Sequence, residues 1–275
     1  MAASLGVSVI VTAYNRKEYL PYALQSLEQQ SFREFETILI TNFPFDTRMY
    51  NLQIKHFQQD GTISDFLYTG VTNSSHGIIC FLDDDDLFEK NKIETILDVF
   101  EDSDVVYIHN NYDIIDEIGE VSNILVKSRA SANLSAISVR KSIIDMKILK
   151  STRTAPDDLM YLFAIRAGGK IVVSPLKLSF YRRYSLNISA NRRDNIPSMK
   201  YGLKQLAEFE KYFHDCPACM KHINASYRHV NLVIDAVSKQ KFPHLFLTTF
   251  RLAVNFDWVL LKVMLNYFIS DYVRK

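Results

Sequence analysis

The chain has few cysteines, no strong charge of either sign and no long apolar run. Three cysteines in 275 residues are too few for a disulfide framework. Lys and Arg number 32 against 31 Asp and Glu, so no overall field draws the chain to nucleic acid, and we expect no nucleic-acid partner. Even in the apolar stretch 242–275, charged residues interrupt every window of about 18 residues, which excludes a membrane-spanning helix.

The beginning of the chain lacks the features of a secretory leader. Residues 1–11, MAASLGVSVIV, contain no basic segment and pass directly into a strand-like run. We therefore expect the protein to reside in the cytoplasm. With 48% hydrophobic residues, the chain can form one large α/β domain or one domain with an appendage.

Residues 78–88, IICFLDDDDLF, are the most informative stretch. The apolar run 78–82 is typical of a strand buried on both faces, and four aspartates follow it directly. Adjacent carboxylates repel one another unless a cation offsets their charge, and ligands of open α/β sheets bind at the carboxyl ends of strands. The stretch therefore favours a divalent metal that carries a phosphate. Alternatively, or in addition, it is an acidic turn in which Asp86 caps a helix that begins near Leu87.

Strands and helices alternate along the chain at the spacing of βαβ units. This alternation predicts a mainly parallel, doubly wound sheet with right-handed crossovers, and a hairpin over residues 112–122 makes the sheet mixed. The predicted strands are residues 7–12, 36–41, 65–68, 78–82, 104–110, 136–140, 171–173 and 178–184. The predicted helices are residues 16–30, one that begins near 141, and 159–167.

Strand-like alternation ends near residue 197. We therefore divide the chain into an α/β catalytic domain, residues 1–196, and a helical C-terminal extension, residues 197–275. Residues 242–275 keep a wide apolar helix face that carries Trp258, with cations beside it. This pattern predicts either a helix that lies on a membrane surface or one that packs on the domain or forms a homodimer.

Cys216 and Cys219 form a C-P-A-C pair between His214 and His222. This spacing is compatible with a zinc site or a redox pair. Because a second C-x-x-C motif is missing, we favour two ordinary thiols in a helical region, with zinc as the alternative.

Four segments recur in the order of a known family. They read VSVIVTAYNRKEYLPYALQSLEQQSF, GVTNSSHGIICFLDDDDLF, APDDLMYLFAIRAGGK and SFYRRYSLNIS. Together they resemble glycosyltransferase family 2 over residues 7–189. The resemblance implies a GT-A fold with a nucleotide-sugar half, about residues 1–110, and an acceptor half, about 111–196. It also implies a nucleotide-diphosphate sugar donor, an Mn²⁺ or Mg²⁺ ion, and transfer to an acceptor hydroxyl with inversion.

The resemblance assigns roles to the acidic run. Asp85 matches the position that binds the metal, and Asp83 or Asp84 matches the ribose side, with Asp83 as a second candidate metal ligand. Because hard cations take oxygen ligands, carboxylates suit the charge that grows on a departing nucleoside diphosphate. Four aspartates in a row leave the register of the family's DxD motif open.

The nucleotide side of the resemblance rests on the ends of two strands. Thr12 and Tyr14 match the end of the first strand, where the aromatic ring packs against the base, and a buried core position is the alternative for Tyr14. Asn42 stands where the family has the Asp that reads the base. An amide both donates and accepts, so UDP- and GDP-linked donors both stay open.

Arg182 and Arg183 match the family's cations near the diphosphate, and Tyr184 replaces a frequent His. An Arg can hold phosphate with two hydrogen bonds, but a surface ion pair is the alternative for either residue. Asp158 matches the family's proposed general base, while Asp157 stands where the family more often has Glu. Alternatively, these two carboxylates only cap the helix that follows.

Two other functions compete with sugar transfer. One is a non-catalytic sugar-nucleotide-binding subunit, suggested by the departures at Asn42 and Tyr184. The other is an aspartyl-phosphate phosphotransferase, which also places DxD after an apolar strand. The acceptor is expected to be a glycan or a lipid-linked glycan, and the second of these would place the protein at the cytoplasmic face of the membrane.

Overall fold

The structure is a computed structural model, and it describes residues 5–122, 133–153, 156–184 and 196–239. The strands are β1 Val7–Ala13, β2 Glu36–Thr41, β3 Ile54–Gln58, β4 Ile78–Asp83, β5 Leu87–Phe88, β6 Val105–Ile115, β7 Ile137–Arg140 and β8 Lys170–Arg182. The helices are α1 Leu20–Glu28, α2 Ile63–Asn73, α3 Lys92–Phe100, α4 Met146–Ser151, α5 Pro156–Ala167, α6 Ile196–Phe213 and α7 Pro217–Lys239. The chain divides into two compact units, Met1–Asn187 and Ile188–Lys275.

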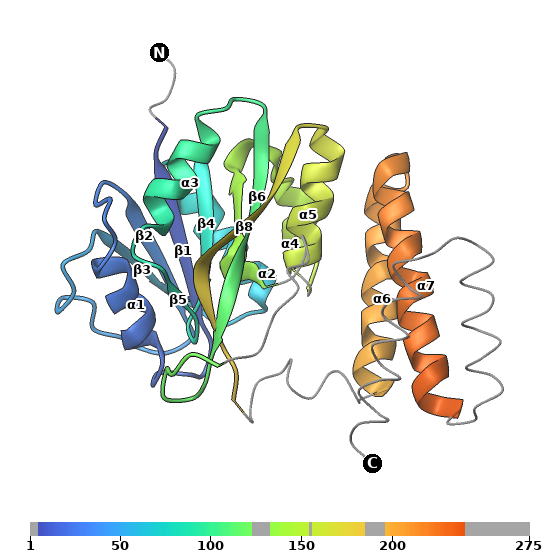
Figure 1. The fold of residues 1–275 in the computed structure, drawn as a ribbon, viewed down its shortest axis with the longest axis horizontal. Helices are drawn as coiled ribbons and strands as arrows, with labels where there is room; N and C mark the ends of the chain where they lie inside the picture. The colour runs from blue at the N-terminus through green and yellow to red at the C-terminus, as the bar shows by residue number, and fades with distance from the viewer. Residues whose placement is uncertain (1–4, 123–132, 154–155, 185–195, 240–275) are drawn as a thin grey trace. The chain divides into compact units, whose positions relative to one another are not determined.

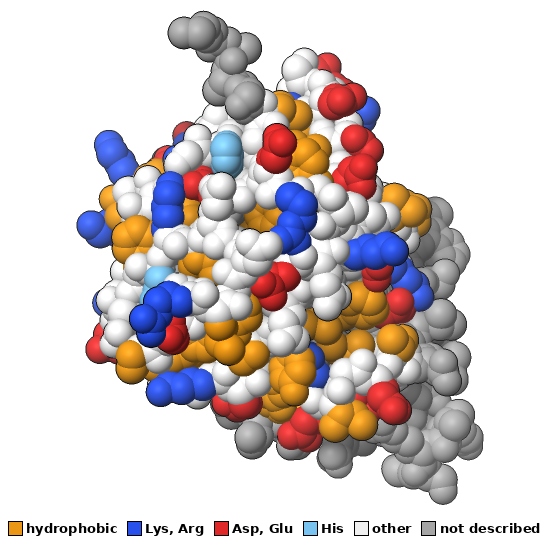
Figure 2. All heavy atoms as spheres, turned by 90° about the vertical axis from the view of Figure 1, so that its left-hand side faces the viewer, with side chains coloured by type: hydrophobic (Ala, Val, Ile, Leu, Met, Phe, Trp, Pro, Cys, Tyr) orange, Lys and Arg blue, Asp and Glu red, His pale blue; other side chains and the backbone are white. Residues whose placement is uncertain are grey.

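The first unit is built on a mixed eight-stranded sheet in the order β3-β2-β1-β4-β7-β6-β8-β5 (Figure 1). The pairs β2–β3, β1–β2, β1–β4 and β6–β8 are parallel, whereas β7 is antiparallel to both of its neighbours and β5 is antiparallel to β8. Figure 2 shows the side of the molecule beside α1 and β3, where acidic and basic side chains are interspersed. The expected mixed, mainly parallel sheet is confirmed.

The central strands are apolar on both faces because helices cover both faces of the sheet. Alternate residues of β1, such as Val9 and Val11, share one core cluster with Leu24 of α1 and Ile96 of α3. The opposite face of β1 meets α2, where a side chain larger than hydrogen at Gly70 would collide with Ile10. This packing fixes the strands whose ends carry the acidic run.

The ends of three neighbouring strands meet at one edge of the sheet. Thr12 lies opposite Asp83 in the β1–β4 pair, and Ala13 lies opposite Thr41 in the β1–β2 pair. The residues that follow β1, β2 and β4 therefore gather at the edge where ligands of such sheets bind. Asn42, directly after β2, belongs to this group.

The strand predicted at residues 65–68 is wrong. These residues lie in α2, whose start is fixed by reciprocal hydrogen bonds: Thr62 N donates to Asp65 Oδ2 at 2.8 Å, and Asp65 N donates to Thr62 Oγ1 at 3.4 Å. The third strand is instead the polar segment Ile54–Gln58, which pairs with β2 at the edge of the sheet. An edge strand is half exposed and can therefore be polar.

The helix expected to begin near Leu87 is present, but its predicted start is wrong. Leu87 and Phe88 form β5 against β8, so Asp86 caps no helix, and α3 begins at Lys92. The predicted strands 171–173 and 178–184 are one continuous strand, β8, with irregular pairing to β6. The predicted hairpin at residues 112–122 is present only as a turn closed by one bridge between Ile115 and Val121.

Glu36, at the start of β2, is a buried carboxylate with several donors. Ser8 Oγ donates to its Oε1 at 2.5 Å, and Lys55 Nζ donates to its Oε2 at 2.7 Å. The Ser75 amide donates to it as well. Although burial raises it, the pKa of Glu36 is held at about 2, below its ordinary value of 4.5, by these hydrogen bonds.

Replacing Glu36 with Gln should lower the free energy of unfolding at pH 7 by about 2 kcal/mol. Because the pKa in the folded state is lower than in the unfolded state, the carboxylate stabilises the fold fully above pH 4.5, and this contribution is lost as the pH falls towards 2. Urea unfolding at pH 7 and pH 3 should show the difference between variant and parent shrinking. The exposed Glu34→Gln is the control, and an equal loss for Glu36→Gln at both pH values would contradict the argument.

The second unit contains the helices α6 and α7. Cys216, directly before α7, forms a disulfide with Cys219 in the first turn of α7. The preference for two ordinary thiols is therefore wrong, and the described residues hold no group of three His, Cys, Asp or Glu side chains that could bind zinc. None of the described helices is long and apolar enough to cross a membrane. The apolar helix expected at residues 242–275 lies outside the described residues and stays a prediction.

The disulfide predicts a thiol count. Cys80 is the free cysteine of the described residues and lies buried in β4. Alkylation in denaturant without reductant, read by intact mass, should therefore modify one cysteine, whereas prior reduction should expose all three. Modification of three cysteines without reductant would show that the pair is not oxidised.

Candidate active site

The acidic run begins at the last residue of β4 and turns inward. Asp83 is partly exposed, whereas Asp84, Asp85 and Asp86 are 0%, 7% and 1% exposed. Thr12 Oγ1 donates to Asp83 Oδ1 at 3.2 Å, which ties the end of β1 to the end of β4. Asp83 is therefore the most accessible of the four carboxylates, and Asp84 is the most enclosed.

Arg16, just after β1, covers two of these carboxylates. Its Nη2 lies 2.5 Å from Asp84 Oδ1, and its Nη1 lies 2.5 Å from Asp85 Oδ2. The hydroxyl of Tyr184 lies 3.2 Å from the same Asp85 oxygen and accepts a hydrogen bond from Arg16 Nη1 at 2.8 Å. Arg16 was missed as a site residue because the sequence places it in the first turn of a predicted helix, 69 residues from Asp85.

Arg182 forms hydrogen bonds that hold the acidic turn in place. Its Nε donates to the carbonyl of Asp85 at 2.9 Å, its Nη1 donates to the carbonyls of Asp116 and Glu117 at 3.0 Å each, and its amide donates to Asp86 Oδ1 at 3.0 Å. The Arg182 side chain is only 3% exposed. The sequence expected this guanidinium near a diphosphate, but the structure directs it to backbone carbonyls. Arg183, by contrast, is exposed.

Three buried polar residues, Lys92, Ser135 and Ser179, lie next to the acidic turn. Ser135 Oγ accepts a hydrogen bond from Asp83 N at 3.0 Å, and the carbonyl of Ser135 accepts one from Lys92 Nζ at 2.5 Å. Lys92 also donates to Ser179 Oγ at 2.9 Å. Burial lowers the pKa of Lys92 to about 7. These contacts hold the end of β4 in place from residues that the sequence analysis did not select.

The nucleotide-side residues occupy the same edge. The Tyr14 amide lies 3.3 Å from Asp84 Oδ2, while the Tyr14 ring is 51% exposed and meets the edge of Phe66. Tyr14 is therefore not a core residue. Asn42 and Asn15 exchange two hydrogen bonds, of 2.7 and 2.9 Å, so the amide of Asn42 is held beside the loop after β1.

Asp157 and Asp158 lie in the first turn of α5, as the sequence predicts. Asp157 is close enough to raise the pKa of Asp83 by its charge, which places the start of α5 next to the acidic run. Both carboxylates also contribute to raising the pKa of Tyr107, after the larger effect of burial. The two acidic segments, which are about 70 residues apart in the sequence, therefore share one region.

The acidic run carries more negative charge than its surroundings offset. Burial, Asp85 and Asp157 raise the pKa of Asp83 to about 7. Burial, Asp85 and Asp83 also raise the pKa of Asp86. Neighbouring carboxylates thus destabilise each other in the charged form, and a divalent cation would relieve this repulsion.

The donor atoms fit a divalent cation that a substrate helps to bind. The described residues assemble no group of three His, Cys, Asp or Glu side chains around one point. Mg²⁺ in nucleotide sites usually takes one or two carboxylates, and substrate phosphates and water complete its coordination. Asp83 and Asp85 carry carboxylate oxygens of this kind, so their chemistry fits Mn²⁺ or Mg²⁺ that a diphosphate helps to bind.

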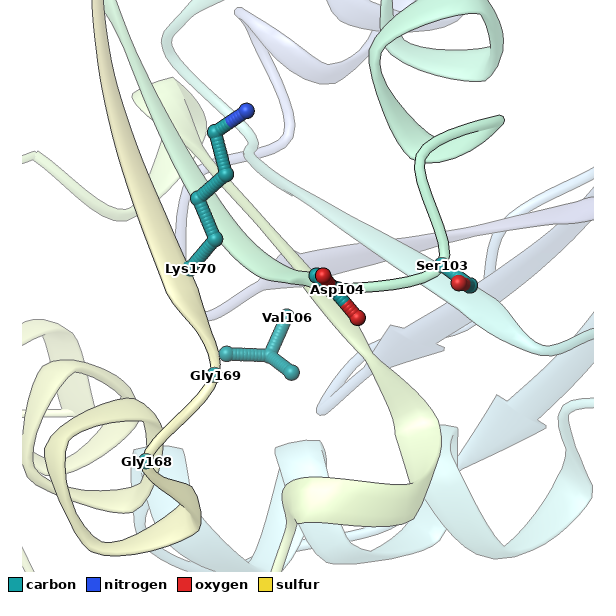
Figure 3. Close-up of a pocket in the computed structure, with 6 residues that line it drawn as sticks. All are labelled: Ser103, Asp104, Val106, Gly168, Gly169 and Lys170. Carbon is teal, nitrogen blue, oxygen red and sulfur yellow. The ribbon is translucent and has the colours of Figure 1, made fainter.

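A hollow at another edge of the sheet is a weaker candidate. It is lined by Ser103, Asp104, Val106, Gly168, Gly169 and Lys170 (Figure 3). These residues precede or begin β6 and β8, so the hollow lies at the amino ends of these strands. Gly169 is required there for packing, because an added Cβ would lie 2.4 Å from Val106 Cγ1. We assign no function to this hollow.

Comparison with known proteins identifies related sequences. Residues 8–141 match the family model described as Glycosyl transferase family 2. A relative from Rickettsia bellii, named an uncharacterized glycosyltransferase, is 28% identical over 171 residues, which is 59% of this chain and 25% of the relative. The chain spans 25 to 28% of the length of the three Rickettsia relatives that match over 171 residues.

Two solved structures share the fold. The mannosyltransferase PcManGT from Pyrobaculum calidifontis, in complex with GDP-Man and Mn²⁺, aligns with a TM-score of 0.60 at 12% identity, covering 96% of this chain and 88% of that one. TarS 1-349 from S. aureus, in complex with UDP-GlcNAc, aligns with a TM-score of 0.53 at 14% identity, covering 97% and 92%. The expected GT-A fold is confirmed by this likeness.

Proposed function

We propose that this chain, whose residues 8–141 match the glycosyltransferase family 2 model, is a metal-dependent inverting glycosyltransferase of that family. It would transfer a sugar from a UDP- or GDP-linked donor to an acceptor hydroxyl. The observation that carries the proposal is the meeting of two acidic segments at one sheet edge, where Asp157 influences the pKa of Asp83. An inverting transfer needs carboxylates at two places, one at the leaving diphosphate and one at the attacking hydroxyl.

On the donor side, we assign the metal to Asp85 with Asp83, and the ribose to Asp83 rather than the enclosed Asp84. A bound Mn²⁺ or Mg²⁺ would neutralise the charge that grows on the departing nucleoside diphosphate. Thr12 positions Asp83 through its hydroxyl, and the exposed ring of Tyr14 offers a surface on which a base can stack.

The base and the phosphates have separate candidates. The amide of Asn42 would contact the base of the nucleotide, and because it donates and accepts, both UDP and GDP stay open. The exposed Arg183 is the better candidate for a phosphate contact. Arg182 would act indirectly, because it holds the Asp85 carbonyl.

On the acceptor side, we assign the general base to Asp158. It is partly buried at the start of α5, next to Asp157. A carboxylate there would take the proton of the acceptor hydroxyl as this attacks the anomeric carbon from the face opposite the diphosphate. If Asp158 only caps the helix, replacing it with Asn should leave turnover unchanged.

A donor screen tests the proposal. The intact chain is incubated with UDP- and GDP-linked sugars in Mn²⁺, and release of nucleoside diphosphate is measured with and without chelator. We expect release from one donor class, and only with the ion present. Nucleotide binding without turnover would favour a non-catalytic subunit, and phosphate release from a phosphomonoester would favour a phosphotransferase.

The acceptor and the location are further parts of the proposal. We propose a glycan or a lipid-linked glycan, reached from the cytoplasm or from the cytoplasmic face of the membrane. Residues 242–275 would contact that membrane or form a homodimer, as their apolar face and cations suggest. Flotation of the intact chain with anionic liposomes at low salt separates these two roles.

A further inference from the structure

Arg16 occupies an unusual position for a cation at a metal site. Its guanidinium forms ion pairs of 2.5 Å with both Asp84 and Asp85, and its side chain is 32% exposed. The two carboxylates are 0% and 9% exposed at their side chains. Arg16 is therefore the direct counter-ion of the enclosed part of the acidic run.

Arg16 contacts one of the two carboxylate oxygens through which Asp85 could bind a metal. Its Nη1 lies against Asp85 Oδ2, the same atom that Tyr184 Oη approaches at 3.2 Å. A cation bound to Asp85 through this oxygen would meet the positive charge of Arg16 at close range. Two cations cannot share one carboxylate oxygen without strong repulsion, so one of them must move.

We propose that Arg16 is an internal cation that divalent metal must displace from Asp85, so that metal and nucleotide diphosphate bind cooperatively. This inference rests on the proposed function, since it concerns the same metal site. Metal alone would have to leave the guanidinium without its counter-charge. A diphosphate supplies new negative charge for the released Arg16, which removes that cost.

The proposal has a thermodynamic consequence in both directions. If the diphosphate strengthens Mn²⁺ binding by a given factor, Mn²⁺ strengthens diphosphate binding by the same factor. Removing Arg16 should shrink this coupling. The matched control is Lys17→Gln, which removes one positive charge from the next residue, whose Nζ lies over the Phe43 ring at 5.2 Å rather than on a carboxylate.

The experiment measures Mn²⁺ binding to the intact chain by calorimetry or by electron paramagnetic resonance, without nucleotide and then with UDP or GDP. We expect Arg16→Gln to bind Mn²⁺ alone about tenfold more tightly than the parent and to lose most of the coupling, whereas Lys17→Gln resembles the parent. Arg16→Lys, which keeps the charge but not the paired contacts, should fall between them. This variant also serves if Arg16→Gln fails to fold.

Each other outcome is decisive. Equal Mn²⁺ affinity in the parent and Arg16→Gln, with nucleotide binding still dependent on the ion, overturns the role of Arg16 and leaves the proposed function intact. An equal gain in Mn²⁺ affinity in Lys17→Gln means that only the net charge of the chain matters, which also overturns the role of Arg16. If neither the parent nor Arg16→Gln binds Mn²⁺ and nucleotide binds without it, both the metal assignment and this inference fall.

Discussion

Replacing Asp158 with Asn should reduce the rate of sugar transfer by about 10²- to 10⁴-fold, the usual contribution of a general base. The amide has nearly the same shape as the carboxylate and can still accept a hydrogen bond at the start of α5, so the helix should keep its cap. It cannot take a proton from the acceptor hydroxyl. Donor affinity should change little, because the partner of Asp158 is the acceptor.

The measurement compares kcat, KM and donor affinity for the parent, Asp158→Asn and Asp157→Asn. Asp157 is the matched control because it lies in the same turn and carries the same charge. Asp157→Asn should remain within about tenfold of the parent if its role is electrostatic. If Asp158→Asn transfers sugar at a rate within about tenfold of the parent, Asp158 is not the general base. If both variants lose the same amount of activity, the effect comes from the negative charge at the start of α5.

The second large effect is expected for Asp85→Ala. If Asp85 holds the metal as proposed, the variant should bind nucleoside diphosphate about 100-fold more weakly in Mn²⁺, equivalent to about 2.7 kcal/mol, and chelator should make no further difference. Calorimetry with UDP and GDP measures this directly. Tight binding by the parent in excess chelator, or an unchanged metal dependence in the variant, would contradict the assignment.

Asp85→Ala also frees the two groups that contact its carboxylate, Arg16 and Tyr184. A thermal melt without metal is therefore needed to show that the variant is folded at the temperature of the binding experiment. Asp46→Ala is the control, because it removes an exposed carboxylate that pairs with Arg48 on the surface. This control should leave nucleotide affinity at the level of the parent.

The sequence was most informative where burial was complete. The strands β1, β2 and β4 are buried along almost their whole length because helices cover both sheet faces, and each lies within one residue of its predicted bounds. The strand prediction for residues 65–68 failed because four largely apolar residues fit a buried strand or a helix equally well. The signal for a helix start is the pair Thr62 and Asp65, which lie three positions apart and form a capping box.

The site was predictable as a set of positions but not as a set of contacts. The family motifs predicted that Thr12, Asp83 and Asp85 lie at one edge of the sheet. The order and register of β1 and β4 place them there. The pairing of Arg16 with Tyr184 joins residues 168 positions apart, and no local pattern encodes it. Likewise, the sequence shows that Arg182 is a cation but cannot show that carbonyls surround it.

The way Arg182 is bound affects how the protein can evolve. Its Nε and Nη1 donate hydrogen bonds to the backbone carbonyls of Asp85, Asp116 and Glu117. Because every residue type has a backbone carbonyl, these bonds do not depend on the side chains at those positions. Side chains in the turn after β6, such as Ile118 with 80% exposure, can therefore change without releasing the grip on Asp85. The side chains of this turn are therefore free to diverge in sequence while the backbone of the acidic run stays fixed.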